Sequence, residues 1–160
     1  MIIQIDSREK KNDDILNYFD SVGQQFFVSK LYTADYVDSE SNKVLIDRKA
    51  NLLELCNNLC SSNGHDRVKA EIKRAKEIGC ERFIFLIADE FIGSVDEVHN
   101  WLMPLARCYI TGEWKPRTKV KPETLQKIMI TMFERYDVEF IFEKPENMGR
   151  KIIELIGGSK

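Results

Sequence analysis

The sequence is poor in the residues that mark several common classes of protein. Its 160 residues include only two histidines, four cysteines and eight glycines. The cysteines show no Cys-x-x-Cys spacing, and neither histidine has a partner at ligand spacing, which argues against a zinc site. No glycine-rich phosphate-binding loop occurs either, so the usual signature of nucleotide binding is missing.

Long hydrophobic runs are also missing. No apolar stretch approaches the ~20 residues that a membrane-spanning helix needs, and the charged start MIIQIDSREKK is unlike a signal peptide. We therefore expect no membrane contact and a cytoplasmic protein with reduced thiols. Cys56 and Cys60 lie four residues apart within an apolar helical stripe, and we interpret them as core residues rather than metal ligands.

Charge is plentiful and unevenly distributed. The net charge is −2, yet Lys115–Lys121 carries four positive charges and no negative one. Arg67–Lys76 carries five positive charges against the single carboxylate of Glu71. Basic clusters in an acidic protein indicate an anionic partner such as DNA, although solvated surfaces have a similar composition. Trp114, beside the first cluster, is a candidate for stacking on a base.

Length and hydrophobic patterning predict one α/β domain around a mostly buried sheet. Segment Arg107–Lys121 has no clear period and is predicted to be a loop. The predicted strands and helices follow the order β-α-β-β-α-α-β-α-α-β-α. The strands are Met1–Ile5, Gln25–Leu31, Lys43–Lys49, Arg82–Ala88 and Val138–Phe142, and the helices are Asn12–Val22, Asn51–Cys60, Asp66–Ile78, a short one from the capping box Ser94–Glu97, Pro122–Tyr136 and Pro145–Ile156.

A charged triplet, Asp47, Arg48 and Lys49, directly follows an apolar strand. Strand side chains alternate between faces, so Asp47 and Lys49 share one face and Arg48 lies on the other. A carboxylate and an ammonium group are costly to bury unless they pair or hold a metal. If Tyr36–Ile46 forms a hairpin, Asp35 returns beside Asp47. A simple ion pair at a sheet edge explains the pattern equally well.

Two further motifs place acids near this strand. Asp6 and Arg8 follow the first strand in the stretch IDSRE. Glu71 lies on the apolar face of the helix predicted over Asp66–Ile78, where a carboxylate breaks the pattern. A glutamate on a buried face near other acids indicates a functional site, whereas a glutamate at the rim of the stripe simply reaches water.

Together these segments resemble the XPF-type nuclease domain, a branch of the PD-(D/E)XK superfamily, in a stand-alone phage or bacterial version. The resemblance covers nearly the whole chain and is carried by IIQIDSRE, LYTADYVDSESNKVLIDRK, HDRVKAEIKRAKE, RFIFLIAD and KPETLQKIMITMFERYDVEFIF. It implies a restriction-endonuclease-like α/β fold, a mixed central sheet flanked by helices. It also implies a single nuclease domain over residues 1–160, without a helix-hairpin-helix module.

The resemblance assigns roles to individual residues. Asp35 matches the acid of the family's Gly-Asp-Tyr motif, with Ala34 in place of the glycine. Asp47, Arg48 and Lys49 match its Glu-Arg-Lys, with aspartate in place of glutamate. The implied ligands of Mg²⁺ or Mn²⁺ are the carboxylates of Asp35 and Asp47 and the main-chain carbonyl of Arg48. The implied catalytic residues are Asp35, Asp47, Lys49 and Glu71.

The implied activity is metal-dependent DNA endonuclease cleavage, with a preference for DNA structure and a homodimer as further expectations. Asp6 matches an additional acid of the family, and the expected DNA contacts are Arg8, Arg67, Lys115, Arg117 and Lys119.

Two alternatives stay open. Departures from the family pattern at Ala34, Asp47, Leu53 and Ala88 are compatible with a DNA-binding protein of the same fold that has lost catalysis. The other alternative is an unrelated small α/β protein whose acids only form surface ion pairs.

Overall fold

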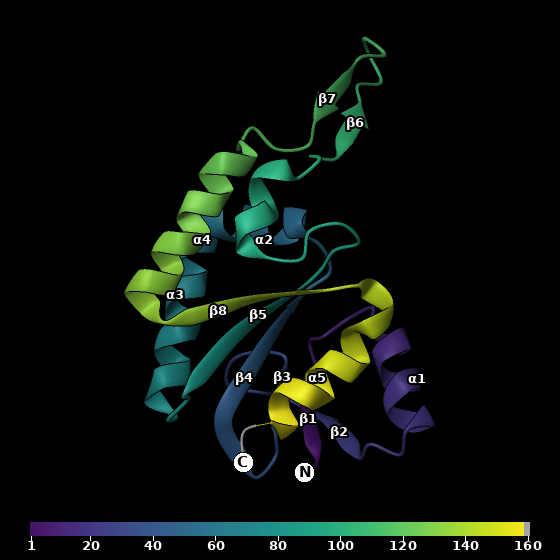
Figure 1. Cartoon of the computed structure of the whole chain (residues 1–160), viewed down its shortest axis with the longest axis vertical. Coiled ribbons are helices and arrows are strands. Elements are labelled where there is room, and N and C mark those ends of the chain that lie inside the picture. Colours follow the sequence, from purple (N-terminus) through teal and green to yellow (C-terminus); the bar gives the residue numbers. More distant parts are fainter. Residues whose placement is uncertain (159–160) are drawn as a thin grey trace.

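A computed structural model describes residues 1–158, which fold around a mixed six-stranded sheet (Figure 1). The strand order is β2-β1-β3-β4-β5-β8. The pairs β1–β2, β4–β5 and β5–β8 are parallel, whereas β3 is antiparallel to both β1 and β4. This mixed sheet confirms the predicted fold class. Its strands are β1 (Ile3–Asp6), β2 (Phe26–Ser29), β3 (Tyr36–Asp38), β4 (Ser41–Lys49), β5 (Arg82–Ala88) and β8 (Val138–Glu143).

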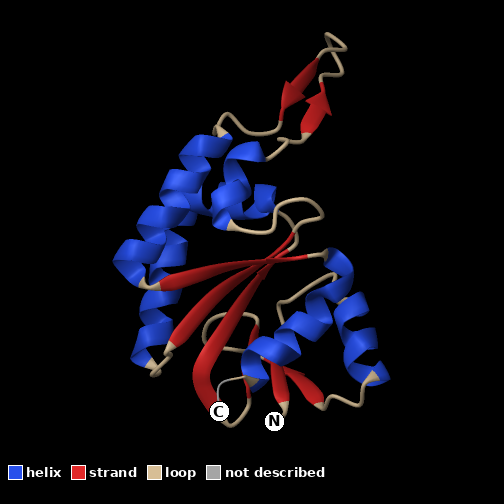
Figure 2. Cartoon of the chain, viewed as in Figure 1, coloured by secondary structure: helices blue, strands red, loops and turns tan. Residues whose placement is uncertain are grey.

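Helices cover both faces of the sheet (Figure 2). On one face lie α2 (Leu52–Cys60), α3 (Ser62–Glu77), α4 (Pro122–Tyr136) and the 3-10 helix η1 (Val95–Asn100), and on the other lie α1 (Asp13–Ser21) and α5 (Met148–Gly157). A short 3-10 helix, η2 (Pro145–Asn147), precedes α5. Within residues 1–158, none of the helices is long and apolar enough to span a bilayer.

The core is divided by the sheet because strand side chains alternate. Along β4, Leu45 packs with the α2–α4 layer, whereas Val44 and Ile46 pack with α1 and α5. Strand β5 is buried on both faces from Phe83 to Ala88, since it lies between β4 and β8 and helices cover the sheet on both sides. Each such side chain stabilises the fold by about 1.5–3 kcal/mol, which makes the central strands a rigid support for the charges that follow β4.

Two local expectations were wrong. The segment expected to be a loop contains a hairpin, β6 (Leu105–Arg107) and β7 (Trp114–Pro116), which projects beyond the helices at one end of the molecule (Figure 1). Both strands are short and exposed, so no buried face imposes a period of two on the sequence. At η1, the Glu97 carboxylate accepts a hydrogen bond from the N–H of Gly93, and the Ser94 side chain forms no capping bond.

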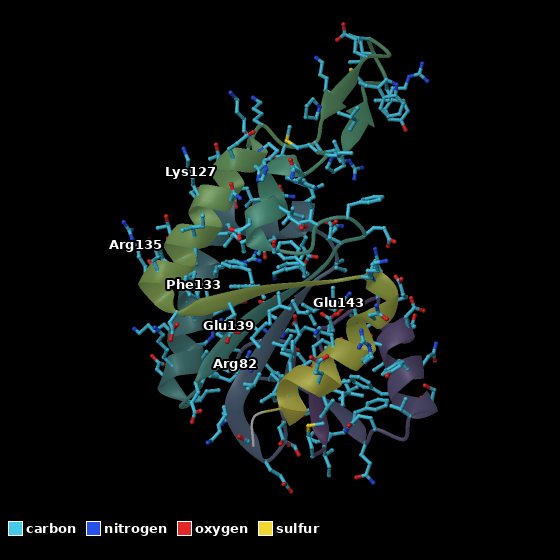
Figure 3. All side chains as sticks on the ribbon, viewed as in Figure 1. Arg82, Lys127, Phe133, Arg135, Glu139 and Glu143 are labelled. Carbon is cyan, nitrogen blue, oxygen red and sulfur yellow. The ribbon has the colours of Figure 1, made fainter. Side chains whose placement is uncertain are left out.

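The end of β8 anchors α5 through a single carboxylate. Glu143 lies 3.8 Å from the side-chain nitrogens of both Arg150 and Lys151 and accepts a hydrogen bond from the Asn147 amide at 3.3 Å. Figure 3 shows Glu143 at the end of β8, next to α5. These contacts set the direction in which α5 runs back across the sheet.

Helices α1 and α5 approach closely where Tyr18 meets Gly149. A Cβ atom on Gly149 would lie 2.8 Å from Cδ1 of Tyr18, too close for the ring to stay in place. We expect Gly149→Ala to lower the free energy of unfolding by about 1–3 kcal/mol, the usual cost of overpacking. Urea denaturation followed by circular dichroism measures this change.

The matched control lies in the same helix. At Gly157 a Cβ would meet only Met1, at an ordinary 3.7 Å. Gly157→Ala should leave stability unchanged or raise it by up to ~1 kcal/mol through helix propensity. Equal denaturation midpoints for the two variants would contradict the close contact.

Candidate active site

Asp35, just before β3, ties the first strand to β4. Its N–H donates to the Ile46 carbonyl at 2.9 Å, and its own carbonyl accepts from the Asp6 N–H at 2.8 Å. Its carboxylate accepts from the N–H of Arg48 at 2.8 Å. The chain therefore returns to β4 as the sequence predicts, and the Asp35 carboxylate lies against the charged triplet.

The residue before Asp35 has an unusual backbone conformation. Ala34 has φ of 65°, in the left-handed region that glycine adopts without cost. This is the position where the XPF-type motif carries glycine. Alanine occupies it at a cost of roughly 1–2 kcal/mol, and its methyl group is buried in the core. Alanine in place of the motif's glycine therefore does not change the backbone conformation that positions Asp35.

Asp47 and Lys49 form a buried ion pair on the face of β4 that α2–α4 cover. Their charged atoms lie 2.5 Å apart, and the two side chains are only 6% and 8% exposed. The Lys49 ammonium also lies 5.8 Å from the centre of the Phe85 ring. Although Lys49 contacts Oδ1 of Asp47, no group within residues 1–158 makes a hydrogen bond of normal geometry to this buried oxygen. The predicted shared face of Asp47 and Lys49 is thus present, with one carboxylate oxygen incompletely satisfied.

Arg48 lies on the opposite face, as alternation requires. Its guanidinium pairs with the carboxylate of Glu9 and donates to the carbonyl of Lys10 at 2.9 Å. Glu9 was not predicted as a site residue. It directly follows the motif IDSR, but its partner is 39 positions away in the sequence, and no local pattern connects the two.

The carboxylates influence one another strongly. Burial, together with the charges of Asp47 and Glu9, raises the pKa of Asp35 well above its usual range. Burial and the neighbouring Asp47 raise the pKa of Glu71 to about 7. Burial opposes the charged form of Lys49, but the Asp47 carboxylate keeps the pKa of Lys49 above its usual value. Asp35, Asp47 and Glu71 therefore form one electrostatic cluster around a single ammonium group.

Asp6 is a buried anchor for Arg8. Its Oδ1 accepts from the N–H and Nε of Arg8 at 2.7 and 2.9 Å, and its Oδ2 accepts from Arg8 Nη2 at 2.6 Å and from the Leu31 N–H at 3.3 Å. Burial works to raise the pKa of Asp6, but these bonds outweigh it and hold the pKa below its usual range. The charges of Asp35 and Glu71 also act on Arg8, which places this exposed guanidinium at the border of the cluster.

Helix α3 brings Glu71 to the cluster. The hydroxyl of Thr33, two residues before Asp35, donates to the Glu71 carbonyl at 3.2 Å. Arg67, one turn earlier on α3, is exposed and free to meet a ligand. Arg74, one turn later, was not predicted as a site residue. Its guanidinium lies 5.9 Å from the centre of the Tyr32 ring, and its buried Nε has no hydrogen-bond partner in the described part of the chain.

The remaining predicted DNA contacts lie apart from the cluster. Lys115 is part of β7, while Arg117 and Lys119 follow it, and all three are exposed. Lys115 lies 3.7 Å from the Glu113 carboxylate, a weak exposed pair. Since they belong to the projecting hairpin, these residues form a second basic surface rather than a wall of the acidic site.

The donor atoms of the cluster suit a hard cation. Among residues 1–158, no three His, Cys, Asp or Glu side chains form a ready metal-binding group. Asp35 and Asp47 nevertheless offer only oxygen donors, which Mg²⁺ and Mn²⁺ prefer, and the buried Oδ1 of Asp47 lacks a well-formed hydrogen bond. The residues present therefore fit such an ion.

A mixed sheet with helices on both faces, and with acids and a lysine at the end of its central strand, defines a restriction-endonuclease-like nuclease domain. The ERCC4 domain family matches residues 5–153, and the chain belongs to this family of nucleases. The predicted XPF-type resemblance is thereby confirmed.

Solved structures agree with this assignment at the level of the fold. The chain is similar to XPF from Aeropyrum pernix, with a TM-score of 0.68 and 17% identity, over 99% of this chain and 65% of that one. For the same archaeal protein in complex with DNA, the TM-score is 0.64 at 17% identity, over 99% and 64% of the two chains. The chain thus spans about two thirds of their length. No match was found among curated proteins.

The buried pair makes a prediction about stability. Lys49→Met removes the ammonium group and leaves the Asp47 carboxylate buried without its partner, so we expect a loss of about 3–5 kcal/mol in the free energy of unfolding without divalent ions. Asp47→Asn together with Lys49→Met should cost much less than the two single changes added together. Chemical denaturation of the four proteins in the double-mutant cycle gives the coupling energy.

The partly exposed pair Arg82–Glu139, which shares two hydrogen bonds, is the matched control, with side chains 39% and 32% exposed on β5 and β8 (Figure 3). Arg82→Met should cost no more than about 1 kcal/mol. A similar cost for both lysine and arginine substitutions would show that the Asp47–Lys49 pair is solvated rather than buried.

Proposed function

We propose that the protein is a metal-dependent endonuclease that cleaves phosphodiester bonds in DNA and prefers branched or partly unpaired DNA. The observation that carries the proposal is the convergence of Asp35, Asp47 and Glu71 around Lys49 at the end of β4. In a domain of a nuclease family, such a cluster is the natural place for hydrolysis. An inert surface ion pair has no need for three carboxylates around one ammonium group.

Each residue of the cluster has a proposed task. Asp35 and Asp47, with the main-chain carbonyl of Arg48, hold Mg²⁺ or Mn²⁺. When bound, the ion supplies charge neutralisation at the phosphate and lowers the pKa of a bound water. Lys49 shares the face of Asp47 and orients the attacking water through its ammonium group. Glu71 holds a second water at the opposite side of the cluster.

Positive residues around the cluster bind the DNA backbone. Arg8 is positioned by the fixed carboxylate of Asp6 and contacts a phosphate with a planar guanidinium. Arg67 and Arg74 lie one turn on either side of Glu71 on α3. Both would therefore contact phosphates along one groove of the DNA. Lys115, Arg117 and Lys119 extend the contact onto the hairpin. The similarity to an archaeal protein studied as a DNA complex supports this assignment.

The central test is cleavage. Purified protein should nick supercoiled plasmid or branched DNA with Mg²⁺ or Mn²⁺, and EDTA should abolish the reaction. Asp35→Asn, Asp47→Asn and Lys49→Met should each lower the rate by at least about 100-fold, since the first two remove a proposed ligand of the ion and the third removes the group that orients the attacking water. Asp20→Asn, an exposed acid on α1, is the control and should cut at the normal rate. Cleavage that persists in EDTA would exclude the metal mechanism.

One outcome of the cleavage test would favour the alternative, a DNA-binding protein of the same fold that has lost catalysis. A wild-type protein that binds DNA but does not cleave it with either ion, while remaining folded, is a DNA-binding protein of the nuclease fold. The shorter aspartate at position 47, where the family motif has glutamate, is the specific feature that this result would implicate.

The basic hairpin makes a prediction about salt. Each phosphate contact on duplex DNA contributes ~0.9 to the slope of log affinity against log salt. Replacing Lys115, Arg117 and Lys119 with alanine should weaken binding to all sequences and flatten this slope by up to roughly 2–3 units. Fluorescence anisotropy with labelled duplex in EDTA gives the slope without cleavage.

Lys127 and Arg135 on α4 provide the control (Figure 3). Their replacement with alanine should leave the slope unchanged. If the hairpin variant keeps the wild-type slope, the DNA path avoids the hairpin.

The homodimer, the cytoplasmic location and the phage or bacterial origin stay predictions. Light scattering coupled to size exclusion tests the first, because a dimer has twice the chain mass of 18.7 kDa.

A further inference from the structure

The hairpin β6–β7 exposes large apolar side chains without a folding reason. Tyr109 and Ile110, at its tip, are 106% and 95% exposed, and Trp114 on β7 is 64% exposed. Hairpin tips normally carry small or polar residues, because those residues suit the turn and the solvent. Clustered apolar side chains on a projecting element mark an interaction site.

The turn itself does not need these side chains. The Cys108 N–H donates to the Glu113 carbonyl at 2.8 Å, and the Gly112 N–H donates to the Cys108 carbonyl at 2.8 Å. Gly112 supplies the left-handed conformation, with φ of 72°. Main-chain bonds and one glycine close the turn, which leaves Tyr109 and Ile110 available for a ligand.

One face of the hairpin is concave and combines aromatic rings with guanidinium groups. Arg107 is directly opposite Trp114 in the strand register, so the two share a face. With Tyr109 and Arg117 they line a hollow of about 490 Å³. Over residues 105–121 the chain carries five positive charges and one negative charge, in a protein of net charge −2. Rings beside cations, in a positive field, complement bases joined by phosphates.

The base of the hairpin contacts α2, the helix that follows β4. The Arg117 N–H donates to the Pro104 carbonyl at 2.8 Å, which closes the stem. The Thr118 hydroxyl lies 3.8 Å from the Cys56 sulfur on α2. Helix α2 begins at Leu52, three residues after Lys49. The base of the hairpin therefore contacts the helix that follows Lys49, and the hairpin projects beyond the helices (Figure 1).

We propose that the concave face of the hairpin binds an unpaired DNA strand, with Tyr109 and Trp114 stacking on bases and Arg107 and Arg117 contacting phosphates. The inference rests on the DNA-binding part of the proposed function and deepens it by naming the feature of the substrate that is read. In a duplex the base faces are stacked on one another, so aromatic side chains reach them only in single-stranded arms.

Intrinsic tryptophan fluorescence tests the contact directly. The chain has two tryptophans. Trp101 is 9% exposed, whereas Trp114 is 64% exposed, so quenching by an added strand reports Trp114. Titration of the full chain in EDTA with a short oligothymidylate should quench the emission, and a blunt duplex of the same length should quench it less, because its bases are stacked on one another and only its phosphates reach the hairpin.

Substitutions at the tip separate stacking from charge. Tyr109→Ala should weaken binding of the oligothymidylate by roughly 5- to 150-fold, because base–aromatic stacking contributes about 1–3 kcal/mol per base. Tyr109→Phe keeps the ring and should bind like the wild type. Phe27→Ala, which removes a partly exposed ring from β2 at the far end of the sheet, should have no effect.

A forked duplex with one single-stranded arm completes the test. The wild-type protein should bind the fork more tightly than the blunt duplex, and Tyr109→Ala should lose this preference while keeping its affinity for the duplex. An unchanged preference in Tyr109→Ala, or an absence of quenching, overturns the inference even if the protein nicks plasmid. Quenching by a protein that cuts no DNA supports the hairpin contact and rejects the nuclease assignment.

Discussion

The neutralisation of charge at the end of β4 is the constraint on which the rest of the structure depends. Asp47 and Lys49 lie on a buried face of β4, and each of these charged side chains is less than a tenth exposed. Their pairing offsets part of the cost of burial, and the raised pKa values of Asp35 and Glu71 show that one ammonium group does not offset the cost of ionising three close carboxyl groups. A cation at this site would favour the ionised carboxylates and would in turn attract the anionic backbone of DNA.

Strand alternation extends this constraint to the other face of the sheet. Arg48 cannot join the cluster and instead pairs with Glu9, which ties the segment after β1 to β4. The main chain of Asp35 adds hydrogen bonds to both strands. Two charged layers, one on each face, therefore lock the ends of the central strands together. The acidic site obtains its geometry from this double connection rather than from any one loop.

The ERCC4 family domain and the hairpin contribute different things to recognition. The domain supplies a sheet that aligns over 99% of the chain with archaeal XPF, at only 17% identity, so the likeness concerns the fold. The hairpin is exposed, basic and aromatic, and it packs on α2 only at its base. In the proposed function, the rigid sheet holds the acids that cut DNA, and the projecting hairpin carries the rings and cations that select it.

The sequence by itself determined the α/β layers, the shared face of Asp47 and Lys49, and the return of Asp35 to β4. All three follow from periodicity and chain reversal, which act over a few residues. Only the tertiary structure decided that Glu9 pairs with Arg48, that Arg74 lies over Tyr32, and that the segment around Trp114 forms a hairpin. The first two join residues far apart in the chain, and the third has exposed strands. Burial of one face is what makes the sequence of a helix or strand periodic. Contacts between residues far apart in the chain, and strands exposed to solvent, therefore produce no periodic pattern in the sequence.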